Sequence, residues 1–101
     1  MAANFKAAKK SVQQVLKRNE NMLRVTDMLK RPQATAKLEA VQTFLRSALA
    51  NIDRSLAPPA YEELQKACAA VDEVPPGLPG YGKEATAVKA ILAQAMQALN
   101  A

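Results

Sequence analysis

The sequence predicts an all-α protein, an antiparallel four-helix bundle built from a long helical hairpin and a shorter second pair of helices. Apolar residues recur every three or four positions along most of the chain, which is the spacing of one helix face. Proline-containing segments interrupt this spacing at three places. No convincing run alternates apolar and polar residues in the way that a half-buried strand requires. With 101 residues, the chain is expected to form a single domain over residues 1–101.

The first predicted helix covers residues 4–31 and is both amphipathic and basic. At about 100° per residue its apolar side chains fall on one arc. That arc holds Phe5, Ala8, Val12, Val15, Leu16, Met22, Leu23 and Leu29. A second arc, which we call the basic face, holds Lys6, Lys10, Lys17 and Arg24. Val25 and Met28 point away from the apolar arc, so the last two turns are apolar on more than one side, as in surfaces that bind a partner.

The second predicted helix covers residues 33–56. It follows a break around Pro32, which cannot continue the first helix and suits the first turn of the next one. Its apolar positions alternate by three and four residues, through Leu38, Val41, Leu45, Ala48 and Ile52 to the pair Ser55/Leu56. Because the connection to the first helix is short, the two helices are expected to form an antiparallel hairpin.

Two shorter helices are predicted over residues 59–74 and 83–100. The first of them opens at Pro59 with Glu62 and Glu63 in its first turn, where the helix dipole favours anions. Its expected buried line is Tyr61, Leu64, Cys68 and Val71. The second is expected to bury Val88, Ile91, Leu92, Ala95, Met96 and Leu99. Residues 75–82 between them contain too many prolines and glycines for regular structure.

The difference in helix length indicates a projecting hairpin tip. At a rise of about 1.5 Å per residue, the tip around residues 28–41 is expected to extend about two turns beyond the short pair. We therefore predict a partner-docking surface there, formed by Val25, Met28, Leu29, Lys30, Arg31 and Lys37. In the alternative arrangement, the fourth helix or the 75–82 loop folds back and covers the tip. Leu78 and Tyr81 are expected to fix that loop to the bundle.

The net charge of +5 is divided unevenly along the chain. Residues 1–54 contain eleven basic and four acidic residues, and residues 55–101 contain three basic and five acidic residues. The two parts therefore carry +7 and −2. This division favours oriented docking onto an anionic partner, although a charged face also serves to keep a small protein in solution.

Catalysis finds little support in the residue types present. The chain has no histidine, the commonest general base and metal ligand near neutral pH. Cys68 lies on a predicted buried line without a neighbour that would lower its pKa. The carboxylate pairs at residues 62–63 and 72–73 diverge by about 100° on a helix. We therefore expect a noncatalytic protein with no cofactor and no metal site.

The number of cysteines and the composition of the first residues indicate a cellular compartment. A single cysteine excludes an intrachain disulfide and favours an intracellular, reducing compartment, either the cytoplasm or an organelle matrix such as that of mitochondria. The first nineteen residues are basic and free of acids, as in a transit peptide, but the apolar spacing continues past them and indicates a retained helix. No stretch of the sequence approaches the roughly 18 apolar residues of a membrane span.

The function that these observations favour is that of a structural or accessory subunit that docks into a multiprotein complex through the hairpin tip and the basic face. One alternative is nonspecific nucleic-acid binding by the basic face. A second is peripheral binding to an anionic membrane surface. Pairing of two copies through their tips is left open. The segment Pro58-Pro59-Ala60-Tyr61 also fits the PPxY pattern that WW domains bind, provided that it is extended and accessible.

Overall fold

The computed structural model describes residues 3–100 and confirms the all-α fold class. The four helices are α1 (Phe5–Met28), α2 (Pro32–Asp53), α3 (Ala57–Asp72) and α4 (Tyr81–Leu99). Each helix packs against the next one in the chain, and α1 also packs against α4. The bundle therefore closes in cross-section, with α1 and α3 at opposite corners. Its overall dimensions are 44 × 21 × 18 Å.

Asn4 fixes the start of α1 through one hydrogen bond of its side chain and one of its backbone. The side chain of Asn4 accepts a hydrogen bond of 3.1 Å from the backbone N–H of Ala7, which satisfies one of the free donors of the first turn. The backbone N–H of Asn4 also donates to the carbonyl of Ala98 at 2.8 Å. This bond ties the beginning of α1 to the end of α4.

Both long helices end three residues earlier than the sequence pattern predicted, because each closes with a left-handed residue. Lys30 has φ 53° and Ser55 has φ 58°. The backbone N–H of the following residue donates to a carbonyl in the last turn of the helix. The bond runs from Arg31 to Thr26 O in α1 and from Leu56 to Asn51 O in α2, and both are 2.9 Å long. These bonds, together with those from Lys30 and Ser55 themselves, form Schellman motifs, which usually have glycine at the left-handed position.

The shorter helices begin earlier than predicted. α3 begins at Ala57, so Pro58 and Pro59 both lie in its first turn, where a missing N–H has no cost. α4 begins at Tyr81 behind Gly80, whose φ of 74° is easily adopted only without a side chain. The loop between α3 and α4 therefore covers residues 73–80.

The main core lies along the bundle axis and is rich in alanine. Leu45, Leu64 and Leu92 are its largest fully buried side chains. The alanines buried between the helices are Ala8, Ala48, Ala60, Ala67 and Ala95. Small side chains at these positions let the helix backbones approach closely, which compensates for the scarcity of aromatic residues.

The predicted buried line of α3 is partly wrong. Leu64 and Val71 are buried, but Tyr61 and Cys68 are only half-buried. The helix is rotated so that its alanines face the core. Apolar periodicity locates a helix face less sharply when alanine occurs on several sides.

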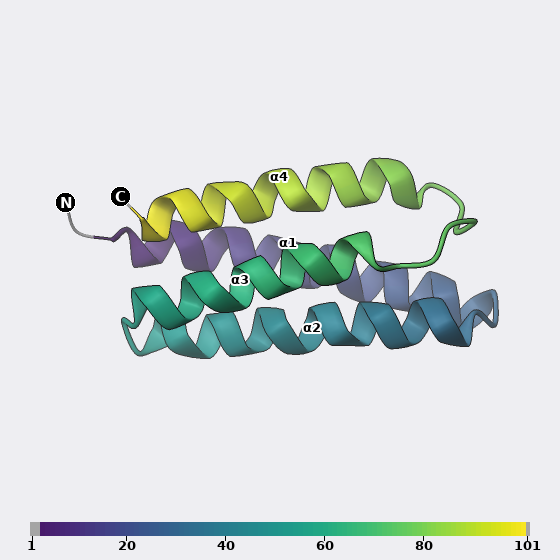
Figure 1. Cartoon of the computed structure of the whole chain (residues 1–101), viewed down its shortest axis with the longest axis horizontal. Helices are drawn as coiled ribbons and strands as arrows, with labels where there is room; N and C mark the ends of the chain where they lie inside the picture. Colours follow the sequence, from purple (N-terminus) through teal and green to yellow (C-terminus); the bar gives the residue numbers. More distant parts are fainter. Residues whose placement is uncertain (1–2, 101) are drawn as a thin grey trace.

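A second apolar cluster shows that the loop between α3 and α4 folds back over the hairpin. Val74 and Leu78 pack against Ala34 and Leu38 of α2, and all four side chains are buried. Figure 1 shows the loop reaching past the ends of the short helices toward the α1–α2 turn. The tip therefore does not project freely, because the loop covers it at Ala34 and Leu38, as in the alternative arrangement. Tyr81 packs beside the same cluster.

Candidate functional site

The exposed part of the hairpin tip is small and sharply defined. Met28 is 80% exposed and Leu29 is 44% exposed. Val25, which we predicted to belong to the docking surface, is instead half-buried against the second cluster. Lys37 is exposed, but its Nζ lies 3.1 Å from Glu73 Oε2, so Lys37 forms an ion pair within the chain. The set that we predicted for partner docking is thus reduced to residues 28–31.

Lys30 and Arg31 follow the exposed apolar pair in the α1–α2 turn. Both are exposed, and neither has a carboxylate within ion-pair distance among residues 3–100. The side chain of Arg31 extends toward the covering loop, where its Nη1 lies 3.9 Å from the position that a Cβ on Gly77 would occupy. The turn therefore presents two free cations directly after two exposed apolar side chains.

A hollow of about 280 Å³ separates this turn from the loop. We call it the turn–loop groove. One wall is formed by residues 30–34, and the other by Pro75, Pro76 and Leu78. Its lining is apolar except for Gln33 and the two cations of the turn.

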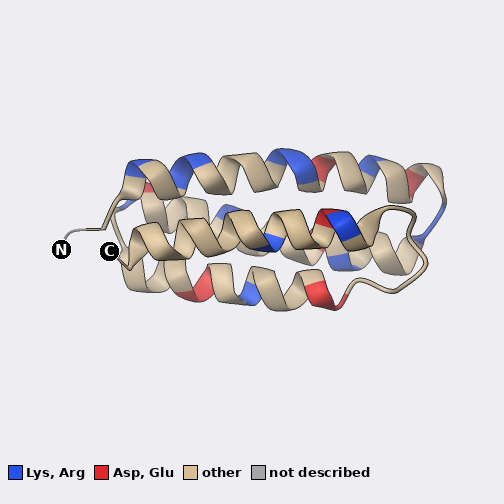
Figure 2. Ribbon diagram, turned by 90° about the horizontal axis from the view of Figure 1, so that it is seen from above, with Lys and Arg blue, Asp and Glu red and all other residues tan. Residues whose placement is uncertain are grey.

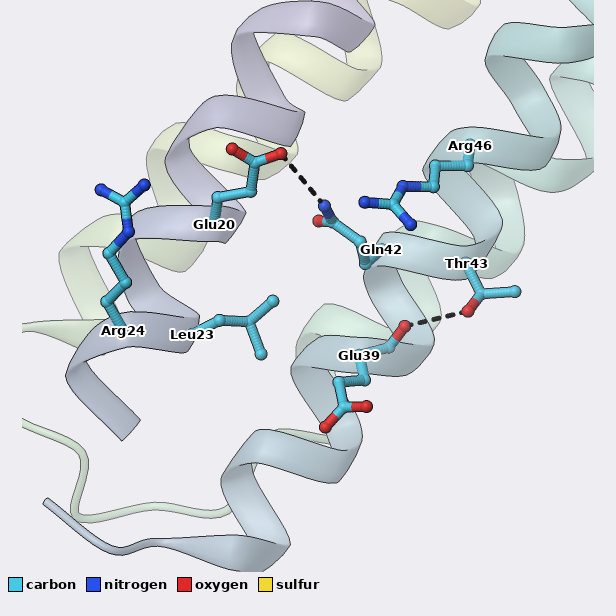
Figure 3. A pocket seen from close by; sticks show the side chains of 7 residues that line it. All are labelled: Glu20, Leu23, Arg24, Glu39, Gln42, Thr43 and Arg46. Atoms are coloured by element: carbon cyan, nitrogen blue, oxygen red, sulfur yellow. Dashed lines mark hydrogen bonds between the residues drawn. The ribbon is translucent and has the colours of Figure 1, made fainter. Parts of the chain in front are cut away.

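A second hollow of about 460 Å³ lies between α1 and α2 (Figure 3). Arg24 comes from one helix and Arg46 from the other, and two carboxylates, Glu20 and Glu39, line the same space. The side chain of Gln42 donates to Glu20 Oε1 at 3.4 Å. Because positive and negative groups are equally represented, this groove has no preference for a ligand of either charge.

Polar side chains are buried between α1 and α2, and the sequence interpretation missed them. Asn19 Nδ2 donates to the carbonyl of Leu38 at 2.9 Å and to Gln42 Oε1 at 2.8 Å. The hydroxyl of Thr35 donates to that of Thr26 at 2.8 Å. A signal was present, since Asn19 and Thr26 continue the three–four spacing of the apolar arc of α1. These bonds lie in the half of the hairpin that leads to the tip.

The predicted basic face is exposed along α1. Lys6, Lys10, Lys17 and Arg24 have no ion-pair partner in the described part of the chain, although Arg24 donates to Asn21 at 3.4 Å. By contrast, two neighbouring cations that lie off this face are paired. Lys9 Nζ is 2.8 Å from Asp53, and Arg18 makes two bonds to Glu84 at 3.0 and 3.2 Å.

Charge is also divided between opposite corners of the bundle. α1 carries six basic and two acidic residues, whereas α3 carries one basic and three acidic residues. Figure 2 shows the basic segments following the length of α1. The uneven charge of the two halves of the sequence therefore becomes an uneven charge across the short axis of the molecule.

Cys68 is the one thiol in the chain. It is half-buried rather than buried as predicted, because α3 turns its alanines to the core. Burial raises the pKa of its thiol, and the negative charge of Asp72 raises it further despite the opposing effect of Lys89. A raised pKa reduces the thiolate fraction at neutral pH, so Cys68 is a poor nucleophile. Within residues 3–100 no three histidine, cysteine or acidic side chains group as metal ligands would.

The PPxY segment is helical. Pro58 and Pro59 lie in the first turn of α3 and Tyr61 is half-buried against the core, so the segment does not have the extended conformation that WW domains bind.

The pKa of Tyr81 tests how the end of the loop packs against the start of α4. Burial, followed by the charges of Asp72 and Glu84, raises the pKa of Tyr81 to about 12. The neutral phenol also lies 3.4 Å from the carbonyl of Val71. Tyr81 in the unfolded chain ionises near its ordinary pKa of about 10. Its contribution to stability is therefore complete below that pH and is lost as the pH rises toward 12.

Tyrosinate absorbance of a Tyr61→Phe variant measures this effect, because Tyr81 is then the only tyrosine. The expected midpoint is about pH 12 in the folded protein and about pH 10 in concentrated urea. Equal midpoints in both conditions would show that the Tyr81 side chain does not pack as described.

Comparison with protein-family models, with curated proteins and with solved structures finds no match for this chain. Among the described residues, none of the helices combines the length and the hydropathy that crossing a bilayer would require.

Proposed function

We propose that the protein is a noncatalytic accessory subunit that docks into a larger protein assembly through the exposed tip of its α1–α2 hairpin. The observation that carries this proposal is the exposure of Met28 and Leu29, at 80% and 44%, beside two cations that have no ion-pair partner among residues 3–100. Methionine adapts to irregular apolar surfaces, and a full burial of such a side chain contributes about 1.5–3 kcal/mol. The single cysteine supports an intracellular, reducing compartment as the place of this assembly.

The tip and the basic face support this role together. Lys10, Lys17 and Arg24 lie on α1, which leads directly into the exposed tip. A partner that covers Met28 and Leu29 therefore meets a basic helix alongside, and acidic groups on that partner would fix its orientation.

The double substitution Met28→Ser and Leu29→Ser tests the proposal. Binding to the native assembly is expected to weaken at least tenfold, because about 1.4 kcal/mol or more of apolar burial is lost. Helix content and thermal stability should change little, since neither side chain belongs to the core. Photo-cross-linking from position 28 in cell extract would identify the partner, and the same cross-links should disappear in competition with unlabelled wild-type protein.

Leu56→Ser is the matched control, because Leu56 is 39% exposed in the turn at the opposite end of the bundle. The proposal fails if Leu56→Ser weakens binding as much as the tip substitutions do. It also fails if the tip substitutions unfold the protein, since these residues would then belong to the core.

Nonspecific nucleic-acid binding is the second candidate, favoured by the four cations of the basic face, which form no ion pair within the described part of the chain. Along a helix, Lys6 to Arg24 span about 27 Å, which is long enough to follow several phosphates. Such binding would weaken steeply as salt is added and would vanish after nuclease treatment. Binding to anionic vesicles, or pairing of two copies through their tips, would instead appear in flotation and sedimentation experiments.

A further inference from the structure

The charge of its lining distinguishes the turn–loop groove from two other hollows near the hairpin tip. The groove between α1 and α2 contains Glu20 and Glu39 beside two arginines. The hollow on the other side of the turn, of about 580 Å³, shares Lys30 and Arg31 with the turn–loop groove but also contains Asp27 and Glu39. The turn–loop groove contains Lys30 and Arg31 but no acidic residue. An anionic group in the turn–loop groove therefore meets these two cations and no carboxylate among the residues that line it.

The backbone adds to this preference. α2 begins in the groove wall with Arg31 as its N-cap, and no side chain caps the first turn. The N–H groups of Gln33 and Ala34 therefore have no capping partner, and the helix dipole places partial positive charge at the same point.

Apart from Gln33, the remaining lining is apolar, and the packing of the bundle holds it in place. Ala34 and Leu78 are buried and join the second cluster, so the base of the groove is part of the packed structure. Pro75 and Pro76 form the facing wall, and their rings restrict the backbone of the loop. At about 280 Å³ the groove lies just below the roughly 300–1,000 Å³ of small-molecule sites, which suits one side chain of a short segment.

We propose that the turn–loop groove receives an acidic segment of the partner protein. One apolar side chain of that segment rests on Ala34, Leu78 and the two prolines, and its carboxylates face Lys30 and Arg31. This inference rests on the proposed docking function and specifies the chemistry of the partner.

Lys30 can be substituted so that its charge is lost and the backbone is not strained. Its left-handed backbone, with φ 53°, is more easily adopted by glycine, so Lys30→Gly removes the charge while relieving backbone strain. Ser55 occupies the equivalent left-handed position in the α2–α3 turn, with φ 58°. Ser55→Gly therefore makes the same backbone change at the other end of the bundle and is the matched control. Neither variant is expected to unfold the protein.

The test uses amide NMR spectra of the full chain and a synthetic peptide of glutamates around one central phenylalanine. Shifts are expected at the amides of residues 30, 31, 33 and 34 and of Gly77 and Leu78. Lys30→Gly should raise the Kd about threefold to fivefold, as for loss of one exposed charge pair. Adding Arg31→Gln should bring the loss to about tenfold. Ser55→Gly should bind as the wild type does.

Two control peptides separate the contributions of charge and apolar contact. Replacing the glutamates by lysines should abolish the shifts, and replacing the phenylalanine by serine should remove those at Leu78. The proposal is overturned if the glutamate peptide causes no shifts. Shifts that follow Lys6 to Arg24, or equal binding by Lys30→Gly and Ser55→Gly, would also overturn it.

The two proposals fail in different ways. If the tip substitutions at residues 28 and 29 release the assembly while the peptide leaves the groove unperturbed, the docking function stands and the acidic segment is wrong. If the peptide occupies the groove but the tip substitutions leave the assembly intact, the groove binds acidic segments and the tip is not the docking surface.

Discussion

Replacing Leu38 with alanine is expected to lower the free energy of unfolding by about 3–5 kcal/mol, as for other fully buried leucines. Leu38 is 0% exposed and belongs to the second apolar cluster, which the loop between α3 and α4 completes. Val74 and Leu78 from the covering loop close the space around it. Small domains are stable by only about 5–15 kcal/mol, so this single loss would be visible in chemical denaturation.

The control for this prediction is Met28→Ala, in the same hairpin but 80% exposed, which should change stability by no more than about 0.5 kcal/mol. Leu78→Ala should reproduce part of the Leu38 effect, because it opens the same cluster from the loop side. A cost below about 1 kcal/mol for Leu38→Ala would mean that the loop does not cover the hairpin in solution.

Replacing Asn19 with alanine is expected to cost about 2–3 kcal/mol. The change removes two hydrogen bonds: the side-chain oxygen of Gln42 loses its donor in a buried place, and the carbonyl of Leu38 keeps only its bond within α2. Unpaired buried polar groups are costly because they have lost water without gaining another partner. Urea denaturation monitored by far-ultraviolet circular dichroism measures the change.

A double-mutant cycle with Gln42 separates this hydrogen bond from the effect of packing. Asn19→Leu alone should destabilise, whereas Asn19→Leu combined with Gln42→Leu should recover much of the loss, because both partners are then apolar. A coupling of about 1–2 kcal/mol is expected. Additive losses would show that the two amides do not depend on each other.

The sequence predicted the helices and their pairing well because those features are local. Three–four spacing of apolar residues sets a helix, and short connections containing proline set antiparallel neighbours. The helix ends were less predictable. Lys30 and Ser55 occupy left-handed positions that glycine usually marks, so nothing in the local sequence identified where α1 and α2 stop.

The site was predictable only in part, for a related reason. Met28 lies off the apolar arc in the sequence, and its side chain is indeed exposed. Val25 and Lys37 have comparable local patterns, but residues far away in the chain cover Val25 and pair with Lys37. Whether a surface is free depends on such distant contacts, which periodicity does not report. The docking role of the tip stays a prediction.

The diagonal placement of α1 and α3 gives the molecule an electric dipole moment across its short axis. A positively charged helix at one corner faces a negatively charged helix at the other, so an anionic partner exerts a torque on the whole bundle before any contact. The molecule would then approach that partner with α1 facing it and α3 facing solvent. Added salt should slow this arrival while leaving the lifetime of an apolar contact at Met28 nearly unchanged.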